Sequence, residues 1–112
     1  MSGRVRPEDI DPVIHERVRL AIVSTLAVAA EMSFNEVKAS LSLTDGNLSA
    51  HARTLEEAGY IQIEKSFRGR RPLTTLRLTH KGREAFRRYL DLLQGIVAQG
   101  MRLAERGEKR ND

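Results

Sequence analysis

The sequence has no cysteine, no tryptophan and only three prolines among its 112 residues. Without cysteine the chain can form neither a disulfide nor a thiolate metal site, and a thiol redox sensor is excluded as well. It also lacks an apolar run of 18 residues and a signal-peptide pattern, so we expect no membrane span and no secretion. These absences indicate a small cytoplasmic protein, and at this length the chain should form a single domain.

Residues that carry enzymatic or metal chemistry do not occur in any recognisable combination. The three histidines, His15, His51 and His80, fall on different predicted elements, and none has a second ligand at metal-binding spacing. We interpret His51, at the edge of a buried helix face, as a half-buried structural residue rather than a ligand. No nucleophile lies at an interpretable spacing from a base, and no glycine-rich phosphate loop is present. The sequence therefore predicts no enzyme, no catalytic residue, no metal site and no cofactor.

Positive charge is concentrated in one part of the chain. The formal net charge is +4, but segment 65–88 holds nine cations and one acid, a net of +8, so the remainder sums to −4. Such segregation suggests a surface that faces a polyanion. A charged face that only contacts water is the alternative that composition leaves open.

The stretch 44–60 predicts a helix over residues 44–58 whose two faces differ. Thr44 can cap the first turn, and Gly59 can adopt the left-handed conformation that ends a helix. Helical periodicity places Leu48, Ala52 and Leu55 on the inward face. The opposite face is small at its centre and polar at its sides: Gly46, Asn47, Ala50, Arg53 and Thr54. That shape fits the DNA major groove, which is ~12 Å wide, although an ordinary amphipathic surface helix remains an alternative for this element alone.

Two runs with a period of two follow this helix and predict a β-hairpin. Ile61 and Ile63 alternate with polar residues in the first run, as Leu76 and Leu78 do in the second. Segment 65–72 between them contains turn residues and four cations. The cations are Lys65, Arg68, Arg70 and Arg71. The order of helix, hairpin and basic tip is typical of a winged helix, in which this hairpin is the wing.

The first part of the chain predicts a flexible polar tail and two helices. Residues 1–10 show no periodicity and form the tail. A first helix is expected over 11–29, started by an acid and a proline. Its inward positions are Ile14, Val18, Ile22 and Leu26. Ser33 and Glu36 form the capping box of a second helix, and Met32 is expected in a short strand beside the wing.

The last predicted helix begins at Thr79 and is longer than the domain can cover. It carries two apolar stripes. One contains Phe86, Leu90, Leu93, Val97, Met101 and Ala104, and the other contains Tyr89, Leu92 and Ile96. At ~1.5 Å per residue the helix extends about 40 Å. We therefore expect a dimer surface made of Tyr89, Leu92, Leu93, Ile96, Val97 and Met101. Fraying after residue 93 is the alternative, and 106–112 is expected to be a polar tail.

Several motifs resemble those of bacterial transcription regulators. The segment Leu-Ser-Ala-His-Ala-Arg-Thr-Leu-Glu-Glu-Ala-Gly-Tyr, residues 48–60, is similar to the recognition helix of ArsR-type and MarR-type proteins. Gly-Arg-Arg-Pro at 69–72, followed by Leu-Thr at 78–79 and Gly82, resembles the wing and last-helix entry of MarR-type proteins. Ala52 departs from the leucine usual in ArsR-type helices, and the wing lacks the acid that often precedes its arginine.

This resemblance implies a mainly α winged helix-turn-helix fold with a small β-hairpin and a long C-terminal helix. The DNA-binding domain would span 11–93, and 94–112 would hold the end of a dimerisation helix and a polar tail. The implied function is a sequence-specific double-stranded DNA-binding regulator, a repressor that acts as a homodimer on an inverted repeat. The expected DNA contacts are Thr44, Asn47, Ser49, Ala50, Arg53 and Thr54 from the helix, and Lys65, Arg68, Arg70 and Arg71 from the wing.

An alternative function is a winged-helix module that docks an acidic protein partner without specific DNA binding. The outward face of helix 44–58 separates the two hypotheses, because a protein-docking face is expected to carry large apolar anchors. The sequence contains no separate ligand-binding domain. If a small-molecule effector exists, we expect it in a cleft between the dimer helices and the DNA-binding lobe.

Overall fold

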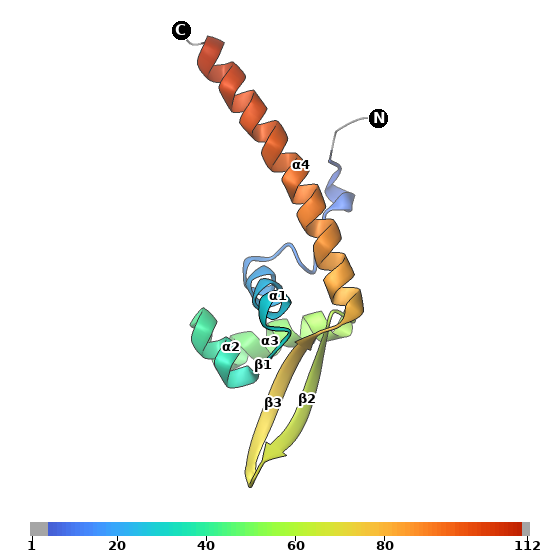
Figure 1. Cartoon of the computed structure of the whole chain (residues 1–112), viewed down its shortest axis with the longest axis vertical. Coiled ribbons are helices and arrows are strands. Elements are labelled where there is room, and N and C mark those ends of the chain that lie inside the picture. The colour runs from blue at the N-terminus through green and yellow to red at the C-terminus, as the bar shows by residue number, and fades with distance from the viewer. Residues whose placement is uncertain (1–4, 111–112) are drawn as a thin grey trace.

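The computed structural model describes residues 5–110, with side chains described through Gly107. Its elements follow one another as η1 (Pro7–Asp9), α1 (Arg17–Ala29), β1 (Glu31–Ser33), α2 (Phe34–Leu41), α3 (Asp45–Glu57), β2 (Ile61–Arg68), β3 (Arg71–Leu78) and α4 (His80–Arg110) (Figure 1). The strands form one antiparallel sheet in the order β1-β3-β2. This is the expected winged-helix fold, and the predicted strand beside the wing is β1.

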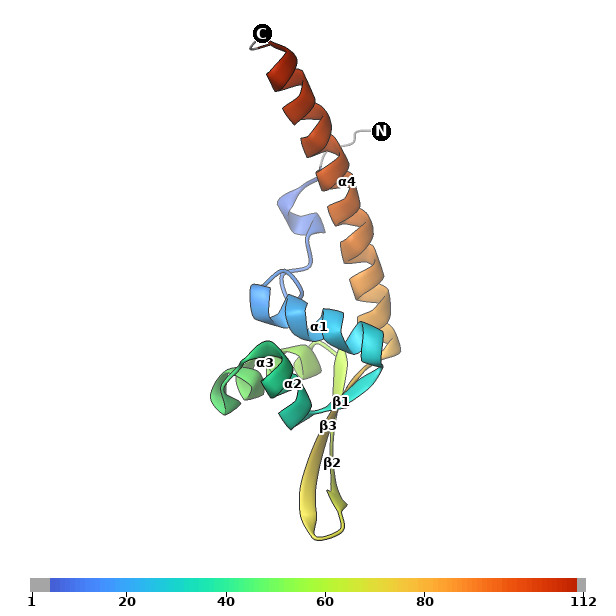
Figure 2. The ribbon, with the colours of Figure 1, turned by 60° about the vertical axis from the view of Figure 1, so that its left-hand side comes forward.

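The molecule is elongated because two elements project from opposite ends of a small helical core. Its extents are 67 × 29 × 21 Å. The β2–β3 hairpin points one way and α4 the other, with α1, α2 and α3 gathered around the base of the hairpin (Figures 1 and 2). No helix in the described part of the chain is both long enough and apolar enough to cross a membrane.

The main core lies between α1, α2, α3 and the base of the sheet. Its buried side chains include Ile22, Val23, Leu26, Val37, Leu48, Leu55, Ile61 and Leu76. The three residues predicted to face inward from the recognition helix are all buried, with Leu48 and Leu55 at 0% exposure and Ala52 at 1%. Each large aliphatic side chain removed from water contributes about 1.5–3 kcal/mol. The inward side of α3 is therefore fixed, and its other side faces outward.

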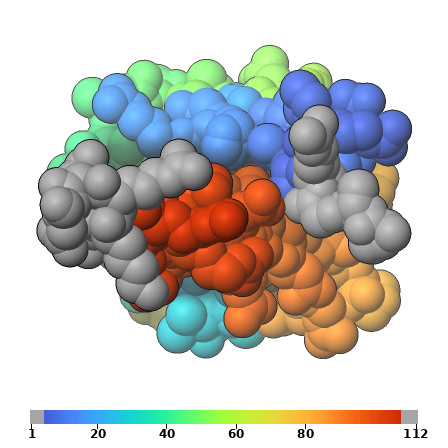
Figure 3. Space-filling model, turned by 90° about the horizontal axis from the view of Figure 1, so that it is seen from above, coloured from blue at the N-terminus to red at the C-terminus, as the bar shows by residue number. Residues whose placement is uncertain are grey.

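A second, smaller core joins the N-terminal segment to the base of α4. Ile14, Ala85 and Tyr89 are buried together, with Ile10 and Leu93 packed against them. Seen from above, the N-terminal segment that precedes α1 lies beside α4 (Figure 3). The expectation of a structureless tail is therefore wrong for residues 7–10, because Ile10 has apolar surface to cover. Residues 1–4 lie outside the described part.

The first helix starts later than predicted. Glu16, not Asp11, caps α1 by accepting the amides of Val18 and Arg19 at 3.0 and 2.8 Å. Asp11 instead caps a separate turn through the Val13 amide at 2.9 Å. The Arg19 Nε donates to the Val13 carbonyl at 2.6 Å and holds that turn against α1. The chain changes direction between this turn and α1. Ile14 therefore lies in the second core, while the buried apolar residues of α1 lie in the main core.

The last helix continues without a break to Arg110. Neither the fraying expected after residue 93 as an alternative nor the polar tail expected from 106 describes residues 94–110. Arginine, glutamate, glutamine and alanine, which favour helices, recur in this segment and offset the glycines at 95, 100 and 107. Residues 111–112 of the predicted tail lie outside the described part.

The predicted caps of the other three helices, α2, α3 and α4, are confirmed by their hydrogen bonds. The Thr44 hydroxyl accepts the Asn47 amide at 3.1 Å, and Ser33 and Glu36 exchange the two bonds of a capping box at 2.9 and 3.0 Å. The Thr79 hydroxyl accepts the Gly82 amide at 3.0 Å. These bonds satisfy backbone donors that the first turn of a helix leaves free.

One junction ties the end of α3, the base of the hairpin and the start of α4 together. The Thr79 hydroxyl donates to the Gly59 carbonyl at 2.6 Å, and the Thr79 amide donates to the Tyr60 carbonyl at 3.0 Å. Gly59 has φ +82°, which glycine adopts without strain. A Cβ added to Gly82 would overlap the Tyr60 carbonyl oxygen, so the backbone of α4 lies directly against this corner.

We predict that Gly82→Ala destabilises the protein by about 1–3 kcal/mol, because the new methyl group must push α4 away from a backbone carbonyl. Thermal or urea unfolding measures the change. Gly46→Ala is the matched control, since a Cβ there meets no atom within 4 Å in the first turn of α3. The control should leave stability unchanged or raise it by up to ~1 kcal/mol. Equal stability of Gly82→Ala and wild type would contradict this account.

Candidate nucleic-acid interface

The outward face of α3 presents the small and polar surface that the sequence predicted. Asn47, Ser49, Ala50 and Arg53 are all exposed. No carboxylate in the described part of the chain lies within ion-pairing distance of Arg53, and this includes Glu57, one turn further along α3. The guanidinium of Arg53 is therefore free to meet a ligand.

Two of the predicted contact residues have their hydroxyls already engaged. The Thr44 hydroxyl caps α3, and the Thr54 hydroxyl donates to the Ala50 carbonyl one turn earlier at 3.3 Å. Thr54 is also only partly exposed. Both residues border the outward face, and their polar groups serve the helix itself.

A cleft separates the recognition helix from the hairpin. It has a volume of about 630 Å³ and is walled by Ser49, Arg53 and Glu56 of α3 and by Lys65 and Thr74 of the hairpin. Apolar side chains of the core, including Ile63 and Leu76, form its floor. The structure thus brings Ser49 and Arg53 of α3 and Lys65 of the hairpin to one hollow. Glu56 was not among the predicted site residues, because an acid near a DNA surface has no motif to mark it.

The wing differs from its predicted form, because the strands run almost to its tip. Segment 65–72 is not a loop: β2 continues to Arg68 and β3 starts at Arg71. Only Gly69 and Arg70 lie between them. Gly69 has φ +66° and Arg70 has a negative φ, the pattern of a two-residue type II′ turn. Pro72 is tolerated inside β3 because β1 pairs only with residues 75–77, leaving that edge open.

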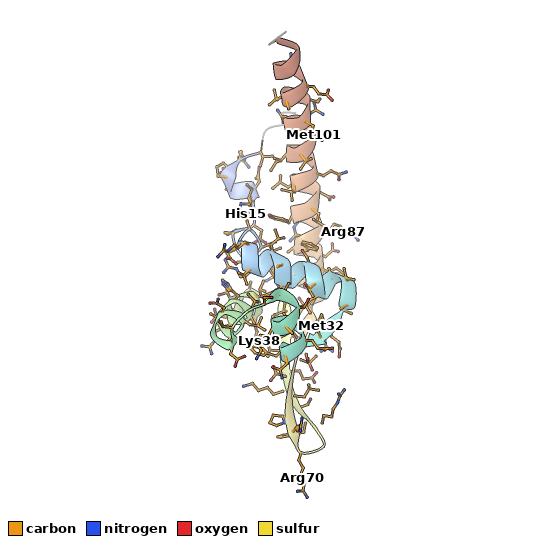
Figure 4. The ribbon with its side chains drawn as sticks, turned by 90° about the vertical axis from the view of Figure 1, so that its left-hand side faces the viewer. His15, Met32, Lys38, Arg70, Arg87 and Met101 are labelled. Carbon is orange, nitrogen blue, oxygen red and sulfur yellow. The ribbon has the colours of Figure 1, made fainter. Side chains whose placement is uncertain are left out.

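The register of the hairpin divides the four wing cations among three positions. Lys65 pairs with Thr74, and both line the cleft beside α3. Arg68 pairs with Arg71, three residues further on, so strand alternation directs both to the opposite face. Arg70 is at the extreme tip, where it points away from the molecule (Figure 4). The wing therefore offers cations on both faces and at its end.

The face that carries Arg68 also borders a second hollow near α2. Glu31, Glu36 and Arg68 are among its lining residues. Hydrogen bonds from Ser33 lower the pKa of the Glu36 carboxyl, and the nearby charge of Arg68 lowers it further. The Arg68 side chain is thus within electrostatic range of the N-terminus of α2.

Two other cations of the domain are already paired. Lys38, the one cation of α2, contacts Asp45 at 2.7 Å and links α2 to the start of α3. Arg77 lies 3.7 Å from Glu31 and donates to Gln62 at 2.6 Å. Among the described residues, Arg53 of α3 and the four wing cations are therefore the ones near the cleft that form no ion pair.

A polar cluster holds the recognition helix to α1. Arg19 Nη1 donates to His51 Nδ1 at 3.2 Å, and Glu16 lies 3.6 Å from the same nitrogen. Burial raises the pKa of Glu16, but the Arg19 amide and the charges of His51 and Arg19 outweigh it, so the pKa is lowered. The predicted structural role of His51 is confirmed, since it is half-buried and bonded on the side of α3 away from the cleft.

The predicted dimer residues separate into covered and open ones. Tyr89 is only 5% exposed, and its hydroxyl is hydrogen-bonded to His15 at 2.9 Å, so the premise that it lies beyond its own domain is wrong. Leu92 and Leu93 are half-buried. The exposed apolar side chains of α4 are Leu90, Ile96, Val97, Met101 and Leu103. The stripe containing Val97 and Met101, rather than the one containing Tyr89, is left open.

These features define a class of protein: a winged helix-turn-helix domain with an exposed recognition helix and a basic wing. Residues 18–97 match the family model of the winged helix DNA-binding domain. The chain belongs to this family. Its DNA-binding character is thereby established at the level of the family.

Known relatives agree with this assignment. The chain is 39% identical over 83 residues to the uncharacterized protein MJ0432 of Methanocaldococcus jannaschii, covering 73% of this chain and 90% of that protein. A solved transcriptional regulator homologue of Pyrococcus horikoshii OT3 has a TM-score of 0.75 and 31% identity, over 78% of this chain and 86% of its own. The expected resemblance to MarR/ArsR-type winged-helix regulators is confirmed.

A more distant structure shares the fold. A MarR-like transcriptional regulator of Thermotoga maritima has a TM-score of 0.52 and 21% identity, over 96% of this chain and 74% of its own. At that identity the likeness concerns the fold alone. It extends over nearly the whole chain, including α4.

We predict opposite effects of one wing substitution on stability and on DNA affinity. Arg68 and Arg71 are directly opposed, and like charges in a cross-strand pair destabilise a hairpin by about 0.2–1 kcal/mol. Arg71→Thr should therefore raise the free energy of unfolding of the free protein and weaken its binding to duplex DNA. Arg77→Thr, on the same strand face, is the control and should lower stability because Arg77 is paired. Unfolding curves that show Arg71→Thr less stable than wild type would overturn the electrostatic argument.

Proposed function

We propose that this protein is a sequence-specific, double-stranded DNA-binding transcription regulator, a repressor that acts as a homodimer on an inverted repeat. The observation that carries the proposal is the cleft that Arg53 of α3 and Lys65 of the wing both line, beside the small and polar outward face of α3. A major groove of ~12 Å admits a helix with such a face. The flanking phosphate backbone would meet the cations of the wing.

Each predicted DNA-contact residue takes a role that follows from its position. The exposed Asn47, Ser49 and Arg53 would contact base edges, while Ala50 allows close approach. Thr44 and Thr54 would shape the helix border, since their hydroxyls are engaged. The wing residues Lys65, Arg68, Arg70 and Arg71 would contact phosphates or enter the minor groove, where arginine is favoured in narrow A-tracts.

The homodimer would form through the distal part of α4, over residues 94–110. Val97 and Met101 are 53% and 63% exposed, and the helix stands clear of the other described elements there (Figures 1 and 2). An apolar stripe on a projecting helix is stabilised by a second copy of the same stripe. Two copies would place two recognition helices about one DNA turn, ~34 Å, apart.

The alternative, a module for an acidic protein partner, is disfavoured by the outward face of α3. Gly46, Ala50 and Arg53 do not supply the large apolar anchors of a protein interface. Selection of bound sequences from a random duplex pool distinguishes the two functions. A regulator enriches one sequence motif and binds it more tightly than bulk DNA, whereas a protein-docking module enriches none.

We predict that Arg53 and the wing arginines affect binding differently. Arg53→Ala should weaken binding to the selected site by about 1–3 kcal/mol, because a bidentate contact to guanine is lost, and leave scrambled duplex nearly unchanged. Arg70→Ala with Arg71→Ala should weaken both, and should make the salt dependence shallower by up to about two charges. Titrations at several salt concentrations test this. An equal loss on both duplexes for Arg53→Ala would make Arg53 a phosphate contact.

We also predict that charge in the open stripe of α4 disrupts the dimer. Val97→Glu with Met101→Glu should give a monomer by light scattering, because two carboxylates cannot be buried at the seam. Gln99→Glu is the control, since it lies on the other side of the helix and should remain dimeric. The monomer should bind a single half-site weakly. A monomeric wild type at micromolar concentration would refute the dimer.

A further inference from the structure

Phe67 is an aromatic side chain left in solvent near the tip of the wing. It is 74% exposed, whereas the other two phenylalanines are half-buried. It pairs across the hairpin with Pro72, so the two form a small apolar ridge. This ridge lies on the same face of the hairpin as Lys65 and Thr74, the face that borders the cleft beside α3. Neither core cluster contains Phe67.

The chain around this ridge is unusually cationic. Arg68 follows Phe67, Arg70 is at the tip, and Arg71 precedes Pro72. None of the three forms an ion pair within the described part of the chain. An apolar ridge bordered by unpaired cations is complementary to a nucleic-acid groove, where sugars and stacked bases lie between two rows of phosphates.

The shape of the hairpin favours insertion of this ridge into a groove of nucleic acid. The loop has only two residues, and Pro72 has no amide hydrogen, so the open edge of β3 at that point offers no donor to another strand. A second sheet therefore gains little by pairing there. Proteins that bind the minor groove place phenylalanine, leucine or proline against base steps and partly unstack them.

We propose that Phe67, supported by Pro72, is an apolar wedge that contacts the DNA minor groove beside the sequence bound by α3. Pyrimidine–purine steps unstack most readily. The wedge therefore adds a preference for such a step at a fixed distance from the bases contacted by Arg53. This inference rests on the proposed function, since it requires duplex DNA in the cleft.

The absence of tryptophan from the sequence makes a direct test available. Phe67→Trp introduces a single indole at the ridge, and its fluorescence should be quenched on addition of the selected duplex by stacking or contact with bases. Ser66→Trp is the matched control, because Ser66 precedes Phe67 on β2 and its side chain faces the opposite side of the hairpin. Strong quenching of both indoles, or of neither, would contradict insertion by Phe67.

A second measurement reports on the DNA. A duplex carrying 2-aminopurine at the flanking step should brighten with wild-type protein and not with Phe67→Ala. Phe67→Ala should lose about tenfold in affinity for the selected duplex, within the range known for base–aromatic contacts. The loss should shrink to less than about threefold when the flexible step is replaced by a stiff A-tract. Val28→Ala, which removes a 90% exposed apolar side chain on α1, is the control and should change neither quantity.

The outcomes separate this inference from the proposed function. If wild type binds no duplex specifically, the proposed function fails and the wedge fails with it. If specific binding persists and Phe67→Ala matches wild type in affinity and 2-aminopurine signal, only the wedge is wrong. If Phe67→Ala changes the molecular mass in light scattering and leaves DNA affinity intact, the ridge contacts a second protein chain and the proposal is overturned.

Discussion

The close contact between the start of α4 and the Tyr60 carbonyl is the constraint on which the rest of the arrangement depends. Gly82 permits it, since any side chain there would overlap that oxygen, and Thr79 adds bonds to the carbonyls of Gly59 and Tyr60. The recognition helix ends at this corner, and the hairpin begins there. The junction therefore relates three directions: α3 across the domain, the wing away from it, and α4 toward the opposite end (Figure 1).

The charge distribution at the wing end of the domain follows from which cations are paired. Lys38 and Arg77 are paired with acids of neighbouring elements and link those elements within the domain. Arg53 and the outer wing arginines have no such partner among the described residues, and Arg68 even opposes Arg71. A charge arrangement that is unfavourable in the free protein becomes favourable when phosphates surround it. Charges that increase affinity for phosphates at the wing thus lower the stability of the free protein, as expected for a functional surface.

The long helix combines two surfaces with different uses. Near its base Ala85 and Tyr89 close a small core with Ile14, and this contact anchors the helix to the N-terminal segment. Further along, Val97 and Met101 have no covering element in the described chain, which gives the proposed dimer its seam. Both surfaces are apolar and repeat with helical spacing, so periodicity alone cannot tell them apart. The assignment of Tyr89 to a partner failed for that reason.

Features that depend on neighbours within one or two turns could be predicted from the order of the amino acids. Caps at Ser33, Thr44 and Thr79, the glycine that ends α3, and the inward faces of helices and strands follow from local hydrogen bonding and periodicity. Features that depend on distant segments or on strand register became visible only in the folded molecule. It placed Pro72 inside a strand, set Lys65 and Arg68 on opposite faces of the wing, and moved the cap of α1 from Asp11 to Glu16. A one-residue change of register would reverse every face of the hairpin, and no local pattern specifies which distant side chains will meet.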